Sequence, residues 1–94
     1  MEVIFKLYIA IIKKKTWPKE FNLIKRGKKK FELRLADFKI KANDTLVLEE
    51  YNPKTKSYSG RKIRRKAKFV YKFDLDQFGQ KQEIEKNGFY IIQI

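Results

Sequence analysis

The sequence predicts one small α+β domain, mainly β, in which several strands surround a single principal helix. A chain of 94 residues is long enough for one domain, residues 1–94, with a modest hydrophobic core. Several stretches place apolar side chains at every second position, which is typical of half-buried strands. Only residues 17–26 place them at helical spacing instead. Apolar and aromatic residues are ample, so global disorder is not expected.

The first expected strand covers residues 3–12, which are apolar in both strand phases, as in a strand buried on both faces. Three lysines follow and close it. Thr16 and Pro18 suit the first turn of a helix over residues 17–26. Gly27 suits the position after its end, where a positive φ costs glycine least. The apolar stripe of this helix consists of Trp17, Phe21 and Ile24.

A second strand is expected over residues 28–35. Its apolar phase consists of Phe31, Leu33 and Leu35, and its charged phase consists of Lys30, Glu32 and Arg34. Glu32 and Arg34 can pair with each other, or each can reach a ligand beside the strand. Arginine carries a planar fork of donors that suits phosphate or carboxylate, and glutamate is an acceptor or a proton carrier. A solvated edge strand with ordinary ion pairs is the alternative interpretation.

A hairpin is expected next, because a strand over residues 45–51 is followed by turn residues 52–57 and by another strand. The apolar phase of that strand holds Ile63, Ala67, Phe69, Tyr71 and Phe73, and the other phase holds Lys62, Arg64, Lys66, Lys68 and Lys72. The strand therefore presents a row of basic side chains to solvent. Arg65 falls in the apolar phase, as expected of a residue at a barrel mouth or bulge. Residues 74–86 predict a loop or short helix, and residues 88–94 predict a final strand.

The absence of cysteine and histidine excludes several kinds of chemistry. Without cysteine there are no disulfides, no thiolate nucleophile and no cysteine metal site, and without histidine the usual zinc ligand and general base are missing. No metal site and no cofactor are expected, since phosphate-loop and dinucleotide motifs are also absent. The apolar residues 1–12 are too short to span a bilayer and lack a signal-peptide pattern, so we expect a cytoplasmic protein with no membrane partner.

The net charge of +13 is large for a chain of this size. Such a surface attracts polyanions, nucleic acids among them. Lysine far outnumbers arginine, however, and isoleucine, phenylalanine and asparagine are also plentiful, which codon bias in an AT-rich genome produces as well. Specific phosphate recognition favours arginine. The placement of the basic residues is therefore more informative than their number.

The charged stretch and its flanks carry a resemblance to a known family. Gly27, Lys29, Glu32 and Arg34 follow the pattern Gly-x-Lys-x-x-Glu-x-Arg, and matching segments occur at residues 15–21, 44–51 and 58–61. With these motifs the chain resembles the ASCH domains of the PUA-like superfamily, and most closely a family of small uncharacterised ASCH-related proteins of bacteria and phages. The resemblance implies a small, partly closed β-barrel with one principal helix. Ile12 stands where that family has a histidine, and Ala36 and Phe38 replace its asparagine and arginine.

These observations predict a monomeric nucleic-acid-binding module with RNA as the preferred ligand. The expected cleft set, which would hold phosphates and choose the ligand, is Lys15, Trp17, Lys29, Glu32, Arg34 and Arg61. The expected basic strand row, which would contact phosphates, is Lys62, Arg64, Lys66 and Lys68. Glu32 could accept from an exocyclic amine, and Trp17, Tyr51 or Tyr58 could stack on a base. For each of these aromatic residues taken singly, packing within the protein is the commoner role.

Two other functions are open. A small, very basic protein from a family frequent in phages could inhibit a host defence nucleoprotein by occupying its nucleic-acid channel or its guide RNA. The resemblance also implies a possible RNA-directed hydrolase, because some ASCH proteins resemble amidohydrolases that remove acetyl from N4-acetylcytidine and others are linked to RNA cleavage. Lys29 matches the lysine of the amidohydrolases and Glu32 replaces their threonine, so these two would be the catalytic residues of any such enzyme.

Overall fold

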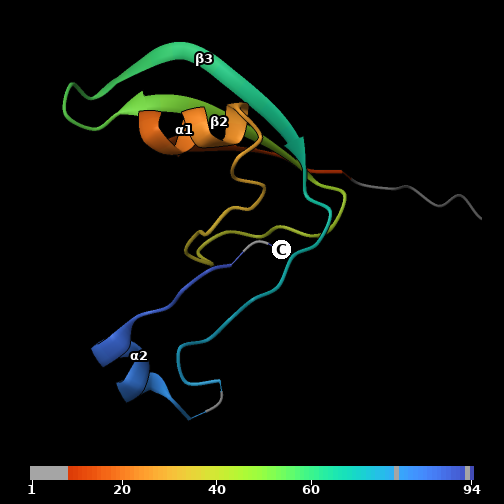
Figure 1. Cartoon of the computed structure of the whole chain (residues 1–94). Helices are drawn as coiled ribbons and strands as arrows, with labels where there is room; N and C mark the ends of the chain where they lie inside the picture. The colour runs from red at the N-terminus through yellow and green to blue at the C-terminus, as the bar shows by residue number, and fades with distance from the viewer. Residues whose placement is uncertain (1–8, 78, 93) are drawn as a thin grey trace, which may run out of the picture.

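A three-stranded mixed sheet with one helix packed on it forms the centre of the chain (Figure 1). The computed structural model describes residues 9–77, 79–92 and 94. The sheet has the order β1-β2-β3, with β1 parallel and β3 antiparallel to β2. In chain order the elements are β1 (Ile11–Thr16), α1 (Pro18–Lys25), β2 (Thr45–Asn52), β3 (Ser57–Lys66) and α2 (Lys81–Asn87).

The chain has the predicted α+β class, but the expected partly closed barrel is wrong. The sheet is open, and β1 and β3 form its two edges. Closure would need further strands, and those expected over residues 28–35 and over the described part of 88–94 do not form. An open sheet leaves one face available to solvent once a helix covers the other.

β1 lies later in the sequence than the first strand that the apolar N-terminal residues predicted. The expected strand covered residues 3–12, and the first part of that range lies outside the described residues. β1 instead includes the three lysines that were expected to close the strand. Its alternate residues Ile12, Lys14 and Thr16 are half-buried or buried, whereas those between them are exposed. A lysine fits this pattern because its stem lies along the protein, and the Lys14 ammonium lies 3.5 Å from the centre of the Phe38 ring.

α1 forms where the helical spacing predicted it and supplies part of the core. Pro18 occupies its first turn, and Gly27 follows its end with a φ of +73°. The helix buries Phe21 and Ile24 against the sheet, whereas Trp17 stays exposed at its start. The core consists of Phe21, Ile24, Leu46, Leu48 and Ile63, with Ile12 and Ile40 packed against it. Because these strand residues face α1, their alternates lie on the opposite face of the sheet.

Residues 28–35 are extended but belong to no strand in the described part of the chain, and their phase is the reverse of the prediction. Phe31, Leu33 and Leu35 were expected in the core and are 37%, 73% and 81% exposed. Glu32 and Arg34 face the protein instead, as half-buried side chains. Arg34 donates hydrogen bonds to β1 and to Glu32, so polar contacts decide which side of this segment is turned inward.

The hairpin of β2 and β3 is confirmed, with residues 53–56 as its turn. Its bulge lies between Glu49 and Tyr51, where β3 contributes the extra residues because the pairing moves from Lys62 to Tyr58. The bulge predicted at Arg65 is wrong, since that residue pairs with Leu46 near the end of β3 and is exposed.

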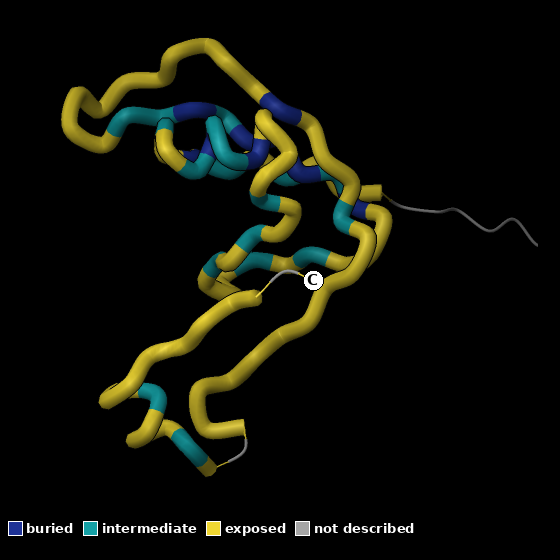
Figure 2. The backbone as a smooth tube through the Cα atoms, in the orientation of Figure 1, coloured by how far each residue is buried: buried dark blue, intermediate teal, exposed yellow. Residues whose placement is uncertain are grey.

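The chain leaves the sheet after β3 and forms an exposed arm (Figure 2). Phe69 and Tyr71, expected on the buried side of a longer strand, are exposed in this arm. α2 agrees with the short helix expected within residues 74–86. The rings of Phe73 and Phe89 meet edge to face, with centroids 5.2 Å apart, and so join the two limbs of the arm. All buried positions among the described residues lie in the sheet, in α1 and at the start of β2.

Asp44 links the starts of the two parallel strands, β1 and β2, by hydrogen bonds. Its buried carboxylate accepts hydrogen bonds from the backbone N–H groups of Ala10 (3.0 Å) and Lys41 (2.9 Å) and from the Lys41 ammonium (2.8 Å). The backbone N–H of Thr45 in turn donates to the carbonyl of Ala10 at 2.9 Å. The hydrogen bonds from Lys41, together with that from Ala10, lower the pKa of Asp44 to about 2.

Replacing Phe21 with alanine should destabilise the protein by about 3–5 kcal/mol, because a buried aromatic ring is lost from the core and leaves a cavity. Phe31→Ala is the matched control, because its ring is 37% exposed and lies outside that core. We expect Phe31→Ala to cost much less in urea unfolding. A cost equal to that of Phe21→Ala would place residues 28–35 in the core, as the sequence alone predicted.

Stability should fall in acid as Asp44 takes up a proton. Its pKa of about 2 in the folded state lies below the ordinary value of 3.8, so the carboxylate stabilises the fold above that value. This stabilisation is lost as the pH falls from about 4 toward 2. Asp44→Asn should therefore have a lower Tm at neutral pH and a smaller further loss of Tm between pH 4 and 2. Thermal melts of both proteins at each pH test this, and equal acid losses in the two would contradict it.

Candidate functional site

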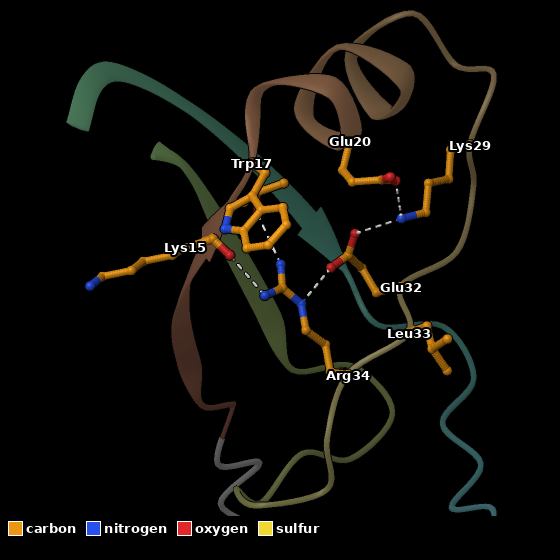
Figure 3. A pocket seen from close by; sticks show the side chains of 8 residues that line it. Lys15, Trp17, Glu20, Lys29, Glu32, Leu33 and Arg34 are labelled. Carbon is orange, nitrogen blue, oxygen red and sulfur yellow. Dashed lines mark hydrogen bonds and ion pairs between the residues drawn. The ribbon is translucent and has the colours of Figure 1, made fainter. Parts of the chain in front are cut away.

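A pocket opens where the end of β1 and the start of α1 meet residues 29–34 (Figure 3). Its volume is about 160 Å³, which is room for roughly five water molecules of about 30 Å³ each. Its lining consists of Lys15, Thr16, Trp17, Glu20, Lys29, Glu32, Leu33 and Arg34. Of the expected cleft set, every member except Arg61 lines this pocket.

The guanidinium of Arg34 fixes one wall of the pocket. Its Nε donates to Glu32 Oε2 at 2.8 Å, its Nη1 to the backbone carbonyl of Lys15 at 2.8 Å, and its Nη2 to Thr16 Oγ1 at 2.9 Å. Thr16 is buried at the end of β1, so its hydroxyl is held in place by the strand. Within the described residues these bonds use three of the five N–H groups of an arginine, which leaves two for a ligand.

Lys29 connects α1 with the extended segment. Its ammonium donates to Glu20 Oε2 at 2.8 Å and lies 4.0 Å from Glu32 Oε1. The hydrogen bond from Lys29 lowers the pKa of Glu20, although burial acts in the opposite direction. The same ammonium lies 5.2 Å from the centre of the Phe31 ring, on the outer side of the segment. One cation thus holds carboxylates from two elements on the same side of the pocket.

Among the residues that line the pocket, Glu32 is the one with a buried oxygen that lacks a hydrogen-bond partner. Its Oε2 accepts from Arg34, but its buried Oε1 has no hydrogen-bond partner among the described residues. The ammonium of Lys29, at 4.0 Å, is near enough to attract the carboxylate and too far to donate to it. A buried acceptor without a donor costs about 1–3 kcal/mol, and more when it is charged. The pocket wall therefore contains a buried carboxylate oxygen that lacks a donor among the described residues.

Lys15 takes a different part in the pocket from the one expected, whereas Trp17 lines it with an exposed side chain, as expected. Lys15 contributes its backbone carbonyl, while its side chain points away (Figure 3). Its ammonium lies 4.3 Å from the centre of the Tyr51 ring and 5.9 Å from that of Tyr58. Trp17 is 60% exposed, and it also lines the pocket (Figure 3). An exposed aromatic face at a rim can stack on a flat ligand.

Arg61 lies outside the pocket and joins three elements. Its guanidinium donates to both carboxylate oxygens of Glu50 at 2.9 and 2.7 Å and to Asn22 Oδ1 at 3.0 Å, and it lies 4.7 Å from the centre of the Phe21 ring. The bidentate bond from Arg61, aided by one from Ser59, lowers the pKa of Glu50 to about 2. The pKa of Arg61 is raised by the same bond. Its position is that of a structural contact between β3, β2 and α1.

The expected basic strand row is exposed, as its strand phase predicted. Lys62, Arg64 and Lys66 lie on β3, whereas Lys68 lies beyond the end of that strand. The Lys62 ammonium lies 3.8 Å from Glu49 Oε2, the one ion pair that these four residues form within the described part of the chain. The row is separate from the pocket, since none of its members lines it.

Three lining residues were not predicted. The sequence assigned Thr16 to the start of the helix and Leu33 to the apolar phase of a strand. It assigned Glu20 to neither the cleft set nor the basic strand row. Glu20 could have been found from the helix, because it follows Trp17 by three residues and therefore lies on the same face. The role of Thr16 has no local pattern, since its hydroxyl is used by a residue that lies 18 positions later.

The described residues hold neither a cluster of metal ligands nor a helix that could span a membrane. No group of three or more His, Cys, Asp or Glu residues there could hold a metal ion. None of the helices in that part of the chain is long and apolar enough to cross a membrane.

Residues 11–89 match the model of a family described as a domain of unknown function, DUF3850. The chain belongs to the DUF3850 family. The matched range of this DUF3850 protein begins with β1 and ends after α2, so it includes the sheet and every residue that lines the pocket. Among curated proteins and among solved structures no match was found. The family match does not itself connect DUF3850 with the ASCH domains that the motifs resemble.

Arg34→Ala should loosen the pocket and leave the sheet folded. The change removes three hydrogen bonds, and bonds to charged groups contribute about 1.5–3 kcal/mol each when well shielded. Because the Arg34 side chain is 27% exposed, we expect a total loss of about 1–3 kcal/mol. Limited trypsin digestion should then cut first after residues 28–30, as judged by mass spectrometry. Arg26→Ala, an exposed position after α1, is the control. Identical first cuts in both variants would show that Arg34 does not hold the segment.

Proposed function

We infer that the protein binds nucleic acid, preferably single-stranded or looped RNA, and that the pocket selects the segment that is bound. The observation that supports this function is the buried Glu32 Oε1, which lacks a donor and lies beside the cations of Lys29 and Arg34. An exocyclic amine of a base would supply the missing donor. The two remaining N–H groups of Arg34 would meet an acceptor of the same base or a phosphate.

The dimensions of the pocket favour one base over a larger ligand. A volume of about 160 Å³ is smaller than the 300–1,000 Å³ of typical pockets for drug-sized molecules. Leu33 and the exposed indole of Trp17 provide apolar surface at the entrance. Unpaired bases are recognised in this way, by stacking on an aromatic ring together with hydrogen bonds to the base edge.

Affinity would come from the surface charge. The basic strand row is exposed, and the chain carries a net charge of +13. Contacts between such cations and phosphates strengthen binding without reading the sequence. The pocket would then add selectivity to an interaction that the charge makes possible.

The hydrolase alternative has less support from the geometry. A lysine acts as a nucleophile when it is neutral, and the Lys29 nitrogen instead donates a hydrogen bond to a carboxylate as an ammonium. The second carboxylate, that of Glu32, is engaged by Arg34 through one oxygen. If RNA-directed hydrolysis is nevertheless detected, Lys29→Ala and Glu32→Gln should each abolish it in protein that melting curves show to be folded.

Glu32→Gln provides the test of the pocket. The substitution removes a negative charge, so electrostatics alone predicts that every RNA binds more tightly. If Glu32 accepts from a base, the variant should bind an RNA obtained by in vitro selection on the wild-type protein several-fold more weakly. Random RNA should bind as well as before or better. Fluorescence anisotropy with both RNAs measures the two affinities.

Glu83→Gln is the matched control, because it makes the same charge change at an exposed position of α2, far from the pocket in sequence. It should affect selected and random RNA alike. If Glu32→Gln also affects them alike, the pocket does not select RNA. If no RNA binds, an RNase-treated pull-down that retains a protein partner would favour the nucleoprotein-inhibitor alternative.

A further inference from the structure

We propose that the sheet face turned away from α1 holds one single strand of nucleic acid between two rows of basic side chains. These residues, here called the open-face cations, are Lys13 and Lys15 on β1 and Lys62, Arg64 and Lys66 on β3. The proposal rests on the proposed function, because it requires a nucleic-acid ligand. It adds Lys13 and Lys15 of β1 as a second row of cations opposite the basic strand row, and places the ligand between the two rows.

The pairing register brings the two rows to the same face. Lys13 lies opposite Val47, which in turn lies opposite Arg64. One step further, Lys15 lies opposite Glu49 and Glu49 opposite Lys62. Side chains of directly opposed residues project to the same side of a sheet. The core residues of β2 occupy the alternate positions and face α1, so the open-face cations project away from the helix.

The open face has more positive charge than the protein itself neutralises. All five open-face cations are exposed. The only carboxylate that pairs with one of them among the described residues is Glu49, at 3.8 Å from the Lys62 ammonium. Lys13, Arg64 and Lys66 form no ion pair within that part of the chain. Clustered unpaired cations create a local field that attracts a polyanion.

The spacing of the rows suits one strand lying along the sheet. Neighbouring strands lie about 4.8 Å apart, so the two rows are separated by about 10 Å, and side chains two residues apart within a row by about 7 Å. Between the rows β2 contributes Val47, which is buried, and Thr45, Glu49 and Tyr51, which are half-buried. A narrow central strip with cations on both sides can follow the backbone of a single strand.

The aromatic end of the open face favours a single strand over a duplex. Tyr51 and Tyr58 meet edge to face, with ring centroids 5.0 Å apart. Tyr58 is 53% exposed, and the Lys15 ammonium lies over the ring of Tyr51. A tyrosine ring can stack on a base only when that base is not held between its neighbours in a helix. Bases of a single strand can meet this condition, whereas those inside a duplex cannot.

Lys15 connects the open face with the pocket. Its ammonium lies on the open face beside Tyr51, and its carbonyl accepts from Arg34 in the pocket wall. Among the described residues β1 forms an edge of the sheet, and no further strand of that part of the chain separates the two sites there. A strand bound along the open face could therefore place a neighbouring base in the pocket.

The double variant Lys13→Gln with Arg64→Gln tests this proposal, since neither residue lines the pocket. Binding of a labelled random single-stranded RNA is measured by anisotropy at several salt concentrations. The slope of log K against log salt should become shallower by about 1.4, which is about 0.7 for each of two lost contacts. Lys81→Gln with Lys86→Gln on α2 makes the same charge change and should leave the slope almost unchanged. Melting curves verify folding, and either single substitution replaces a double variant that melts early.

The outcomes separate the proposal from the proposed function. A shallower slope for the open-face variant alone, with weaker binding of the same RNA annealed to its complement, supports the proposal. Equal slopes for the two double variants, or equal affinity for single strand and duplex, would overturn it even if RNA is bound. If the open-face variant behaves as expected while Glu32→Gln affects all RNAs alike, the pocket does not select RNA, but the open-face proposal is supported. If no nucleic acid binds, both the proposed function and the open-face proposal are wrong.

Discussion

The hydrogen bonds of the Asp44 carboxylate are the contacts on which the arrangement of the chain depends. They join the backbone at Ala10 to the start of β2, across a sequence separation of 34 residues. Parallel strands cannot be connected by a tight turn, so the connection here contains α1 and the extended segment. Once the two beginnings are fixed, the register places Lys15 opposite Glu49. The pocket at the end of β1 and the open face beside β2 both follow from that register.

The elements that the sequence predicted well are those with local causes. The proline and glycine at its ends and the apolar stripe define α1, and turn residues define the hairpin. The parallel pairing of β1 with β2 has no such local pattern. The three lysines of β1 predicted the end of a strand, but they lie within it. The phase of residues 28–35 was predicted from apolar alternation, but the core on the helix side of β2 is already filled by Phe21 and Ile24. The bonds of Arg34 to β1 and to Glu32 turn the charged phase inward instead.

The pocket was more predictable than the fold around it. The spacing of Glu32 and Arg34 identified two of its charged groups, because a carboxylate and a guanidinium two residues apart in an extended chain must share a side. Strand alternation grouped Lys30 with them, whereas Lys29, which lines the pocket, was indicated by the family pattern alone. The sequence could not show that Arg34 also bonds to Thr16, or that Glu32 keeps one oxygen without a donor. Those features depend on a long-range contact between two segments. For the same reason Arg61 was placed in the cleft, although its partner Glu50 lies on the neighbouring strand.

The distribution of ion pairs argues that the open face is more than a consequence of lysine content. Carboxylates on the helix side and in the pocket each hold a cation at 2.8 Å or less: Glu20 binds Lys29, Glu32 binds Arg34, Asp44 binds Lys41, and Glu50 binds Arg61. The acidic residues of the sheet region are thus used mainly as internal partners. On the open face a single carboxylate, that of Glu49, stands among the open-face cations. Genome composition can raise the number of lysines, but it does not choose the strand phase on which they fall or remove carboxylates from one face. Burial of the alternate phase against α1 places lysines on this face, and the proposed polyanionic ligand would account for the shortage of carboxylates there.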